Sequence, residues 1–319
     1  MQSIDETTKD NIFGIIQNFL KLPPVIIWGS GATIPYGLPS MAVLNDIIKN
    51  KVADYDNTAV NLEEELGKDK YESCMPEIRQ IIWNTIKEAD EKIIIHLLHN
   101  SSHFNGIYAI IKKCIAAEPK VANIITTNYD RILEYVMAYH GIQFTDGFNG
   151  RHLSAFNDTL FQEKNIVNLV KVHGSINWGC NNNDIRYVDC LEEYTPVIIP
   201  PGKNKYREAY KEPYRELIHI ADQIISNANS IFVVGFGFND EHLTPKVKEK
   251  AAKGTPIVLI TLKISDTTYK ELQSAQKYVL IESAKDNKSK VHIKKDNQIH
   301  EYIIDGEYWQ LNKFMEEVI

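Results

Sequence analysis

Two polar side chains, Asn128 and His173, directly follow apolar runs of strand length, where side chains can do chemistry. Asn128 follows the run at 121–125, and His173 follows the run at 166–172. An amide can hold a sugar hydroxyl or a water, and an imidazole can accept a proton near neutral pH. Taken singly, a turn-capping asparagine and a hydrogen-bonded core histidine explain them equally well. Together they indicate a general-base reaction on a hydroxyl or a water.

Glycine-rich segments follow two further apolar runs. The segment Gly-Ser-Gly-Ala-Thr at 29–33 comes after Val25–Trp28, and a helical pattern runs from Pro39 to about Lys51. Gly235 and Gly237 follow the run 231–234 in the same way. Glycine lets a backbone approach a phosphate, so both loops can present N–H groups to a diphosphate, although a turn without a ligand would show the same pattern.

Two common nucleotide-binding classes are disfavoured by these loops. The chain has no G-x-x-x-x-G-K-[ST] motif, so its loops lack the phosphate-binding lysine of P-loop ATPases. The first loop also departs from G-x-G-x-x-G because Ile34 follows Thr33, which is a poor match to hydride-transfer dehydrogenases.

Apolar runs alternate with helical patterns along most of the chain. This order predicts an α/β fold with a Rossmann-like, doubly wound parallel sheet, in which ligands lie beyond the carboxyl ends of the strands. The four polar or glycine-rich strand ends should therefore meet at one nucleotide-sized site. Helices are expected at 4–20, 39–51, 132–139, 206–227, 265–276 and 308–318, and further strands at 197–199, 257–262 and 278–281, with a hairpin at 291–303 that turns at Asp296-Asn297.

A single domain is expected over 1–319, with two additions to the sheet. Residues 53–119 contain helical patterns and no β-rich run, which predicts an inserted helical module over the cleft. Residues 285–319 form the C-terminal hairpin and helix. His96, His99 and His103 fall at i, i+3 and i+7 in the insertion, but without a carboxylate or cysteine partner they favour ordinary surface histidines over a metal site.

Composition narrows the classes of partner. The 319 residues carry a net charge of −7, which is a poor match to the clustered Lys and Arg that nucleic acid requires. None of the 4 cysteines is in C-x-x-C spacing, so neither a metal ribbon nor a disulfide scaffold is expected. The polar N-terminus does not resemble a signal peptide, and no apolar run is long enough to span a bilayer. We therefore expect a cytoplasmic protein without a membrane or direct nucleic-acid partner.

Four motifs together resemble the sirtuin-like family. They are GSGAT with GLPSM, TTNYD, VHGS and VGFGFNDEH, in the family's order between Val25 and His242. The likeness is stronger to the bacterial anti-phage defence branch, which includes the Thoeris effector and HerA-associated proteins. The resemblance implies a Rossmann-like domain that binds NAD, with a small helical module over the cleft.

The resemblance also implies roles for particular residues. Asn128 and His173 match the catalytic asparagine and histidine. The implied NAD contacts are Gly29, Ser30, Gly31, Ala32 and Thr33 at the diphosphate and ribose, Gly37, Leu38 and Pro39 near the nicotinamide, Asp130 in the T-x-N-x-D motif, and Gly235, Gly237 and Asp240 near the adenosine.

The chain departs from the zinc-containing deacylases of the family. Their paired C-x-x-C motifs are missing, because the corresponding interval holds only Cys180 and Cys190. No zinc or other metal is therefore expected, and the absent ribbon disfavours binding of an acyl-lysine peptide. Tyr129 also stands where deacylases usually carry isoleucine, as in the defence branch. The implied activity is NAD hydrolysis to nicotinamide and ADP-ribose, which empties an infected cell of NAD.

Two other functions remain open at this point: an NAD-dependent protein deacylase, and a non-catalytic nucleotide-binding subunit of a larger defence complex. An NAD-depleting enzyme must be held inactive until needed. We expect control through a homo-oligomer or a HerA-type ATPase partner, with the helical insertion and the C-terminal hairpin as contact surfaces, since a Rossmann core does not need them.

Overall fold

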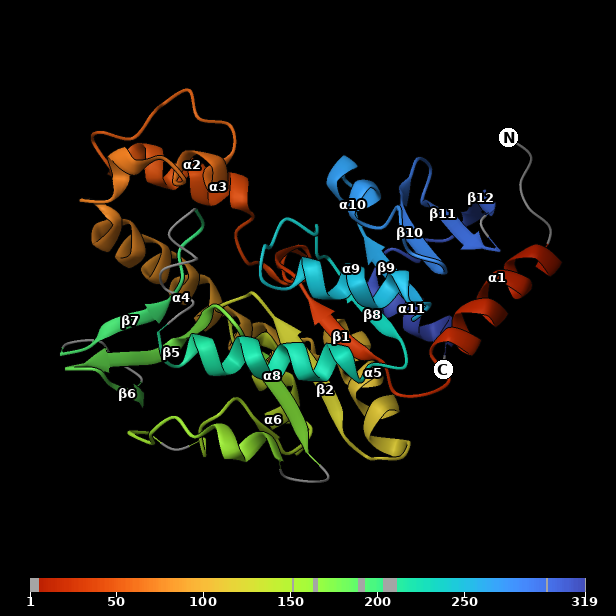
Figure 1. Cartoon of the computed structure of the whole chain (residues 1–319), viewed down its shortest axis with the longest axis horizontal. Coiled ribbons are helices and arrows are strands. Elements are labelled where there is room, and N and C mark those ends of the chain that lie inside the picture. Colours follow the sequence, from red (N-terminus) through yellow and green to blue (C-terminus); the bar gives the residue numbers. More distant parts are fainter. Residues whose placement is uncertain are drawn as a thin grey trace.

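The architecture is taken from a computed structural model that describes residues 6–150, 152–162, 166–188, 193–202, 211–296 and 298–318. These residues form a sheet of 9 strands in the order β12-β11-β10-β9-β8-β1-β2-β4-β3 (Figure 1). The strands are β1 (Val25–Trp28), β2 (Ala122–Thr126), β3 (Phe144–Thr145), β4 (Val167–Lys171), β8 (Ile231–Val234), β9 (Ile257–Thr261), β10 (Tyr278–Ala284), β11 (Lys288–Lys295) and β12 (Gln298–Asp305).

The predicted α/β class is confirmed. The seven neighbouring strands β10, β9, β8, β1, β2, β4 and β3 pair in parallel. The predicted C-terminal hairpin, β11 with β12, extends the sheet antiparallel; Asn297 at its turn lies outside the described residues. Successive residues of a strand point to opposite faces. In β1, Ile26 and Trp28 therefore join one hydrophobic core while Val25 and Ile27 join the other.

Helices cover both faces of the sheet. One core includes residues of α1 (Glu6–Phe19), α5 (Asn105–Ala116), α6 (Ile132–Tyr139) and α11 (Leu311–Val318). The other includes residues of α8 (Tyr214–Ser226) and α9 (Thr244–Ala252), and also Ile264 and Leu272 on either side of α10 (Asp266–Glu271). The helix predicted at 206–227 is described only from Tyr214, since 203–210 lie outside the described residues. Helix α9 was not predicted, because its sequence TPKVKEKAA is mostly polar.

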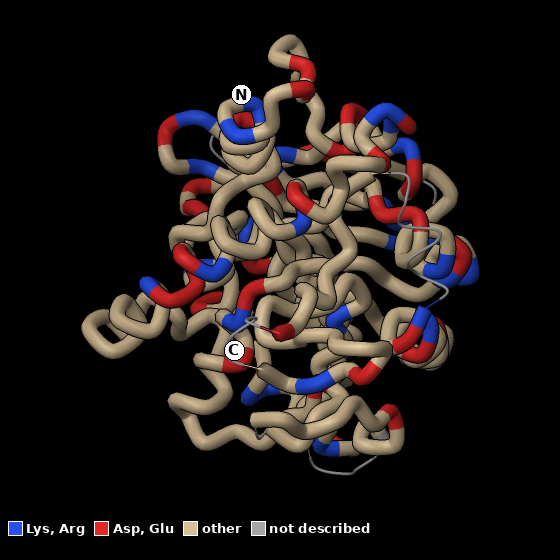
Figure 2. The backbone as a smooth tube through the Cα atoms, turned by 90° about the vertical axis from the view of Figure 1, so that its left-hand side faces the viewer, with Lys and Arg blue, Asp and Glu red and all other residues tan. Residues whose placement is uncertain are grey.

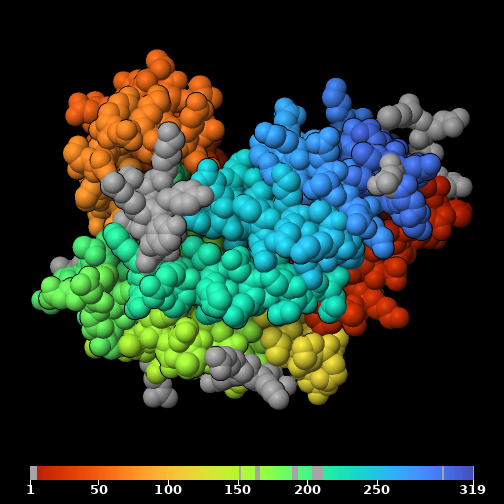
Figure 3. Space-filling model, viewed as in Figure 1, coloured from red at the N-terminus to blue at the C-terminus, as the bar shows by residue number. Residues whose placement is uncertain are grey.

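The predicted insertion divides between two places. Helices α2 (Met41–Lys51) and α3 (Leu62–Glu65) and the start of α4 (Met75–His99) form a lobe, orange in Figure 3. Ser40 caps α2, where its Oγ accepts a hydrogen bond from the Val43 N–H at 3.3 Å. Helix α5 instead packs on β2 and α11 and so belongs to the main core.

A second sheet was not predicted. Strands β5 (Gly174–Asn181), β6 (Asp184–Tyr187) and β7 (Thr195–Ile198) pair antiparallel in the order β6-β5-β7. The strand predicted at 197–199 is therefore part of this small sheet and not of the parallel one. Asn182 and Asn183 turn the β5–β6 hairpin with positive φ angles of 49° and 63°. Strand β5 contains two glycines and two asparagines, so its sequence lacks the alternation of apolar and polar residues that predicts a strand.

Figure 2 views the molecule from the left-hand side of Figure 1, and on this side Lys and Arg are interspersed with Asp and Glu. Within the described ranges, we find no helix with the length and apolar character that a membrane crossing requires.

The glycine-rich loops after β1 and β8 touch each other through their backbones. The Gly31 N–H donates to the Gly235 oxygen at 2.9 Å. A Cβ on Gly29 would lie 2.4 Å from that oxygen, and a Cβ on Gly235 would lie 2.1 Å from the Ala32 nitrogen. Gly235 also has a φ of +59°, which L side chains rarely adopt. Glycine at these positions is therefore required for the two loops to meet.

We expect Gly235→Ala to lower the free energy of unfolding by roughly 2 to 4 kcal/mol, from the left-handed conformation and the overlap together. Gly14→Ala is the matched control, because nothing lies within 4 Å of a Cβ at this position in α1. It should raise stability by up to about 1 kcal/mol. Urea unfolding of the three proteins measures both effects, and equal stabilities would contradict the loop contact.

Candidate active site

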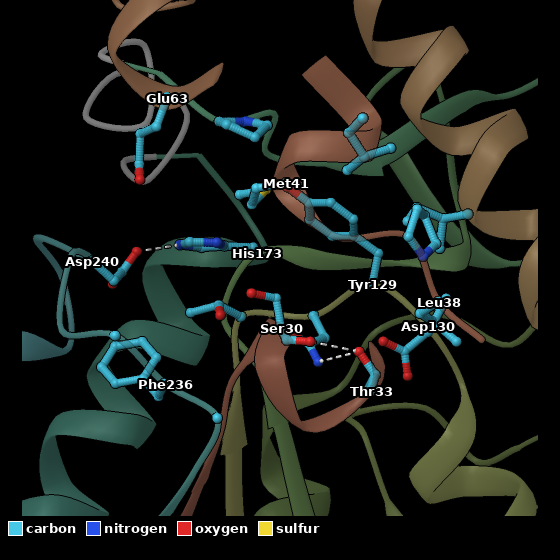
Figure 4. Close-up of a pocket in the computed structure, with 18 of the residues that line it drawn as sticks. Ser30, Thr33, Leu38, Met41, Glu63, Tyr129, Asp130, His173, Phe236 and Asp240 are labelled. Atoms are coloured by element: carbon cyan, nitrogen blue, oxygen red, sulfur yellow. Dashed lines mark hydrogen bonds and ion pairs between the residues drawn. The ribbon is translucent and has the colours of Figure 1, made fainter. Parts of the chain in front are cut away.

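A cavity with an open volume of about 860 Å³ lies where β1, β2, β4 and β8 end. It sits at the switch point of the sheet, where β1 has β2 on one side and β8 on the other. Of the predicted site residues, those that line the cavity are Ser30, Thr33, Pro39, Asn128, Asp130, His173, Gly235, Gly237 and Asp240 (Figure 4). The four strand ends thus converge as the sequence indicated.

Leu38 lines the cavity as well, whereas four predicted residues, Gly37 and the first-loop residues Gly29, Gly31 and Ala32, are not among those that line it. The N–H groups of Gly29, Gly31 and Ala32 donate to the carbonyls of Val234, Gly235 and Gly29 at 2.9, 2.9 and 3.1 Å. Their backbone donors therefore hold the loops together and are not aimed at a ligand. The N–H of Gly235 is likewise not aimed at a ligand, because it donates to the Ile260 oxygen at 3.0 Å.

Asn128 is fixed by the first loop. Its Nδ2 donates to the Gly29 oxygen at 3.0 Å and lies 3.5 Å from the Thr33 Oγ1. Its backbone N–H donates to the Thr126 Oγ1 at 3.0 Å. The amide nitrogen is thus occupied by the fold, and among the described side chains and backbone no donor reaches Oδ1. That oxygen is an acceptor that a ligand hydroxyl or a water can use.

His173 is paired with Asp240. The His173 Nε2 lies 3.0 Å from the Asp240 Oδ2, and the two side chains are only 4% and 5% exposed. Asp240 is itself held, because its Oδ1 accepts hydrogen bonds from the N–H groups of His242 and Leu243 at 3.1 and 3.0 Å. The carboxylate oxygen beside Nε2 orients the ring. Asp240, which was expected at the adenosine end, lies beside the predicted catalytic histidine.

Asp130 lines the cavity beside a buried cluster of charges. The pKa of its carboxyl is raised to about 7, chiefly by burial; the carboxylates of Asp90 and Glu134 also raise this pKa, and Lys171 lowers it. The Lys171 Nζ donates to the Asp130 backbone oxygen and to the Glu134 Oε1, both at 2.6 Å. The side chain of Asp130 accepts a hydrogen bond from the Ile132 N–H at 3.3 Å, at the start of α6.

Tyr129 and Glu63 are among the lining residues that were not predicted as site residues. The Tyr129 hydroxyl donates to the Ile199 oxygen just after β7, so it ties the main sheet to the small sheet. Figure 4 draws Tyr129, His173 and Asp240 in that order across the cavity. Tyr129 lies within the TTNYD motif and could have been found there. Glu63 comes from α3, whose sequence carries no signal of a site.

The expectation of no metal stays a prediction. Cys180 is a free thiol in β5, and Cys190 lies outside the described residues. A search of the described residues finds no group of three or more His, Cys, Asp or Glu that could hold a metal. Of the three histidines in the insertion, His96 and His103 stack with ring centroids 5.0 Å apart.

Known proteins resemble this chain at the level of domain and fold. Residues 122–279 match the SIR2-like domain. This match supports a sirtuin-like family for the chain. A solved structure described as a basis for the mechanism and regulation of Sir2 enzymes aligns with a TM-score of 0.50 and 13% identity, covering 97% of this chain and 98% of that one.

A mutant Sir2 homologue in complex with ADP ribose aligns equally well, with a TM-score of 0.50 and 13% identity over 99% of this chain and 95% of that one. At these identities the likeness shows the fold. No curated protein matches the chain.

We expect the stability of the protein to depend on pH through Asp130. Because burial raises its pKa to about 7, Asp130 holds its proton more tightly in the folded protein than in the unfolded chain. The free energy of unfolding therefore falls as the pH rises toward and through 7. Asp130→Asn cannot ionise, so its free energy of unfolding should gain roughly 2 to 4 kcal/mol relative to the parent between pH 4 and pH 8. Urea titrations at both pH values measure this. The exposed Asp54→Asn is the control, and a difference that stays constant with pH for Asp130→Asn would contradict the assignment.

Proposed function

We propose that the protein is an NAD⁺ glycohydrolase that cleaves NAD to nicotinamide and ADP-ribose. The observation that carries this proposal is the buried pair of His173 and Asp240, 3.0 Å apart, in the same cavity as Asn128. The SIR2-like match over residues 122–279 supports NAD as the substrate. A Sir2 homologue of the same fold was solved with ADP ribose, one of the two products proposed here.

His173 is the proposed general base. When Asp240 holds the proton on Nε2, the lone pair on Nδ1 is free to accept a proton from a ribose hydroxyl or a water. The carboxylate then stabilises the imidazolium that forms. Burial of the pair strengthens this attraction, because little water screens it.

Asn128 is the proposed positioning group for the ribose or the water. Its Nδ2 is held by the Gly29 oxygen, so the direction of Oδ1 is set before a ligand arrives. Cleavage of the nicotinamide–ribose bond passes through an oxocarbenium-like state. A preorganised amide dipole beside that centre favours the separation of charge without reorganisation.

Among the described residues that line the cavity, no cationic side chain is available to bind the diphosphate. The described residues that line the cavity include Glu63, Asp130 and Asp240 but no Lys or Arg. Backbone donors are therefore the available partners. Ser30 and Gly237 line the cavity, and their N–H groups have no acceptor among the described residues. A diphosphate bound there would need to stay away from the three carboxyl groups.

Tyr129 favours hydrolysis over deacylation. Tyr129 lines the same cavity as His173, and its hydroxyl donates to the Ile199 oxygen. A bulky ring fixed in this place narrows the approach of a peptide side chain to the histidine, whereas a water can still enter. Together with the missing C-x-x-C motifs, this supports water as the acceptor of the ADP-ribosyl group.

In the cell, the proposed role is an NAD-depleting effector of anti-phage defence. This part rests on the likeness of the TTNYD motif to the defence branch. The proposed restraint is assembly, as a homo-oligomer or with a HerA-type ATPase. The lobe of α2, α3 and the start of α4 and the β11–β12 hairpin are the proposed contact surfaces.

We expect His173→Ala to reduce nicotinamide release from NAD by about 10²- to 10⁴-fold, because the general base is lost. Asn128→Ala should reduce it by about 10- to 10³-fold, from loss of positioning. His99→Ala is the control, since His99 is exposed on α4. Chromatography of the products measures the rates, and thermal unfolding shows that each variant is folded. Folded His173→Ala protein that hydrolyses NAD at the parent rate would refute the assignment.

Assembly should change the activity. We expect the specific activity to vary with protein concentration over the range where light scattering detects a change in oligomeric state. A protein that stays monomeric and fully active at every concentration, without a partner, would contradict control by assembly.

A further inference from the structure

A second cavity, with an open volume of about 1330 Å³, lies between α6, β3 and the small sheet. The described residues that line it have none in common with the lining of the first cavity. Helix α6 and strand β6 both lie in the lower half of Figure 1. The proposed hydrolysis of NAD makes no use of this space.

A buried amide in this cavity lacks a partner. Asn177, in β5, lines the cavity and is 3% exposed. Its side chain is hydrogen-bonded to that of Tyr187, but its Oδ1 is buried with no partner among the described residues. An unsatisfied buried acceptor costs about 1 to 3 kcal/mol. The cavity therefore offers an oxygen that a ligand with an N–H group would satisfy.

Among the described residues that line the cavity, carboxylates outnumber cations, with Glu134 and Asp146 against Arg131. The Arg131 guanidinium is bound to Asp90, 2.8 and 2.9 Å from the carboxylate. Glu134 is bound to Lys171. The described hydrogen bonds to Asp146 come from neutral donors, the Phe148 N–H at 3.2 Å and the Trp178 indole at 3.3 Å.

The pKa of Asp146 agrees with this excess. Burial, together with the charge of Glu134, raises this pKa to about 6, while Lys171 acts in the opposite direction. A positive charge brought into the cavity would relieve this repulsion between buried carboxylates. The electrostatics therefore favour a cation.

The second cavity has four aromatic residues in its lining, Tyr135, Phe144, Phe148 and Tyr187. The rings of Phe148 and Tyr187 lie 6.1 Å apart between centroids and at 64° to each other. Aromatic faces attract cations and stack on flat rings, so these walls favour a ligand that is planar as well as positive.

We propose that this second cavity binds a small planar aromatic cation, whose N–H groups donate to the Asn177 Oδ1 and whose charge is balanced by Asp146. Amidinium and protonated aminoheterocycle groups belong to this class. The binding is independent of the chemistry at His173, so it can be tested whether or not the protein hydrolyses NAD.

The test uses benzamidine, a planar aromatic cation, and benzamide, which has nearly the same shape and is neutral. We expect calorimetry at neutral pH to show benzamidine binding at least about tenfold more tightly than benzamide, since a charge in an acidic aromatic site adds roughly 1 to 2 kcal/mol. Asp146→Asn should remove most of this difference and leave the weak binding of benzamide unchanged.

The variant Ala138→Phe tests whether benzamidine binds in this cavity. Ala138 is exposed on α6 and lines the cavity, so a larger ring there obstructs it without entering the core. We expect benzamidine affinity to fall at least about tenfold. Ala116→Phe, at an exposed position near the end of α5, is the matched control and should bind as the parent does. Thermal unfolding shows that the variants are folded.

Three results would overturn the proposal. One is the absence of benzamidine binding at millimolar concentration, and another is equal affinity for the cation and the neutral amide. The third is full affinity in both Ala138→Phe and Asp146→Asn with displacement by NAD, which would place the probe in the first cavity.

Discussion

The backbone contact between the loops after β1 and β8 is the constraint on which the site depends. It leaves no room for a side chain at Gly29 or Gly235. The Gly29 oxygen at this contact holds the amide of Asn128. From Gly235 the chain leads on to Asp240, whose carboxylate lies beside His173. The close approach of these two loops therefore orients both proposed reactive residues. Gly29 and Gly235 are needed for the loops to meet, whether or not a ligand is bound.

A buried cluster of charges joins the two cavities. The Nζ of Lys171 contacts the Asp130 backbone oxygen on the side of the first cavity and the Glu134 carboxylate on the side of the second. Lys171 is fully buried, so both contacts lie in a medium that screens charge weakly. A change of charge in either cavity will therefore act on the ionisation of Asp130, which lies between them and has a pKa of about 7.

The sequence predicted the central sheet well because its strands are short, β-branched and wholly buried. Val25–Trp28 and Ile231–Val234 have the predicted bounds. It also placed the four strand ends in one cavity, as parallel topology requires. The small sheet was missed, since glycine and asparagine in Gly174–Asn181 carry no periodic signal. The pairing of His173 with Asp240 could not be predicted, because it joins residues far apart in the chain through packing alone.

The most direct measurement is the release of nicotinamide from NAD by the purified protein, with and without an acylated lysine peptide. Water as the acceptor predicts nicotinamide and ADP-ribose in equal amounts, at a rate that the peptide does not change. Nicotinamide release that requires the peptide, with O-acyl-ADP-ribose as the second product, would contradict the hydrolase and establish a deacylase.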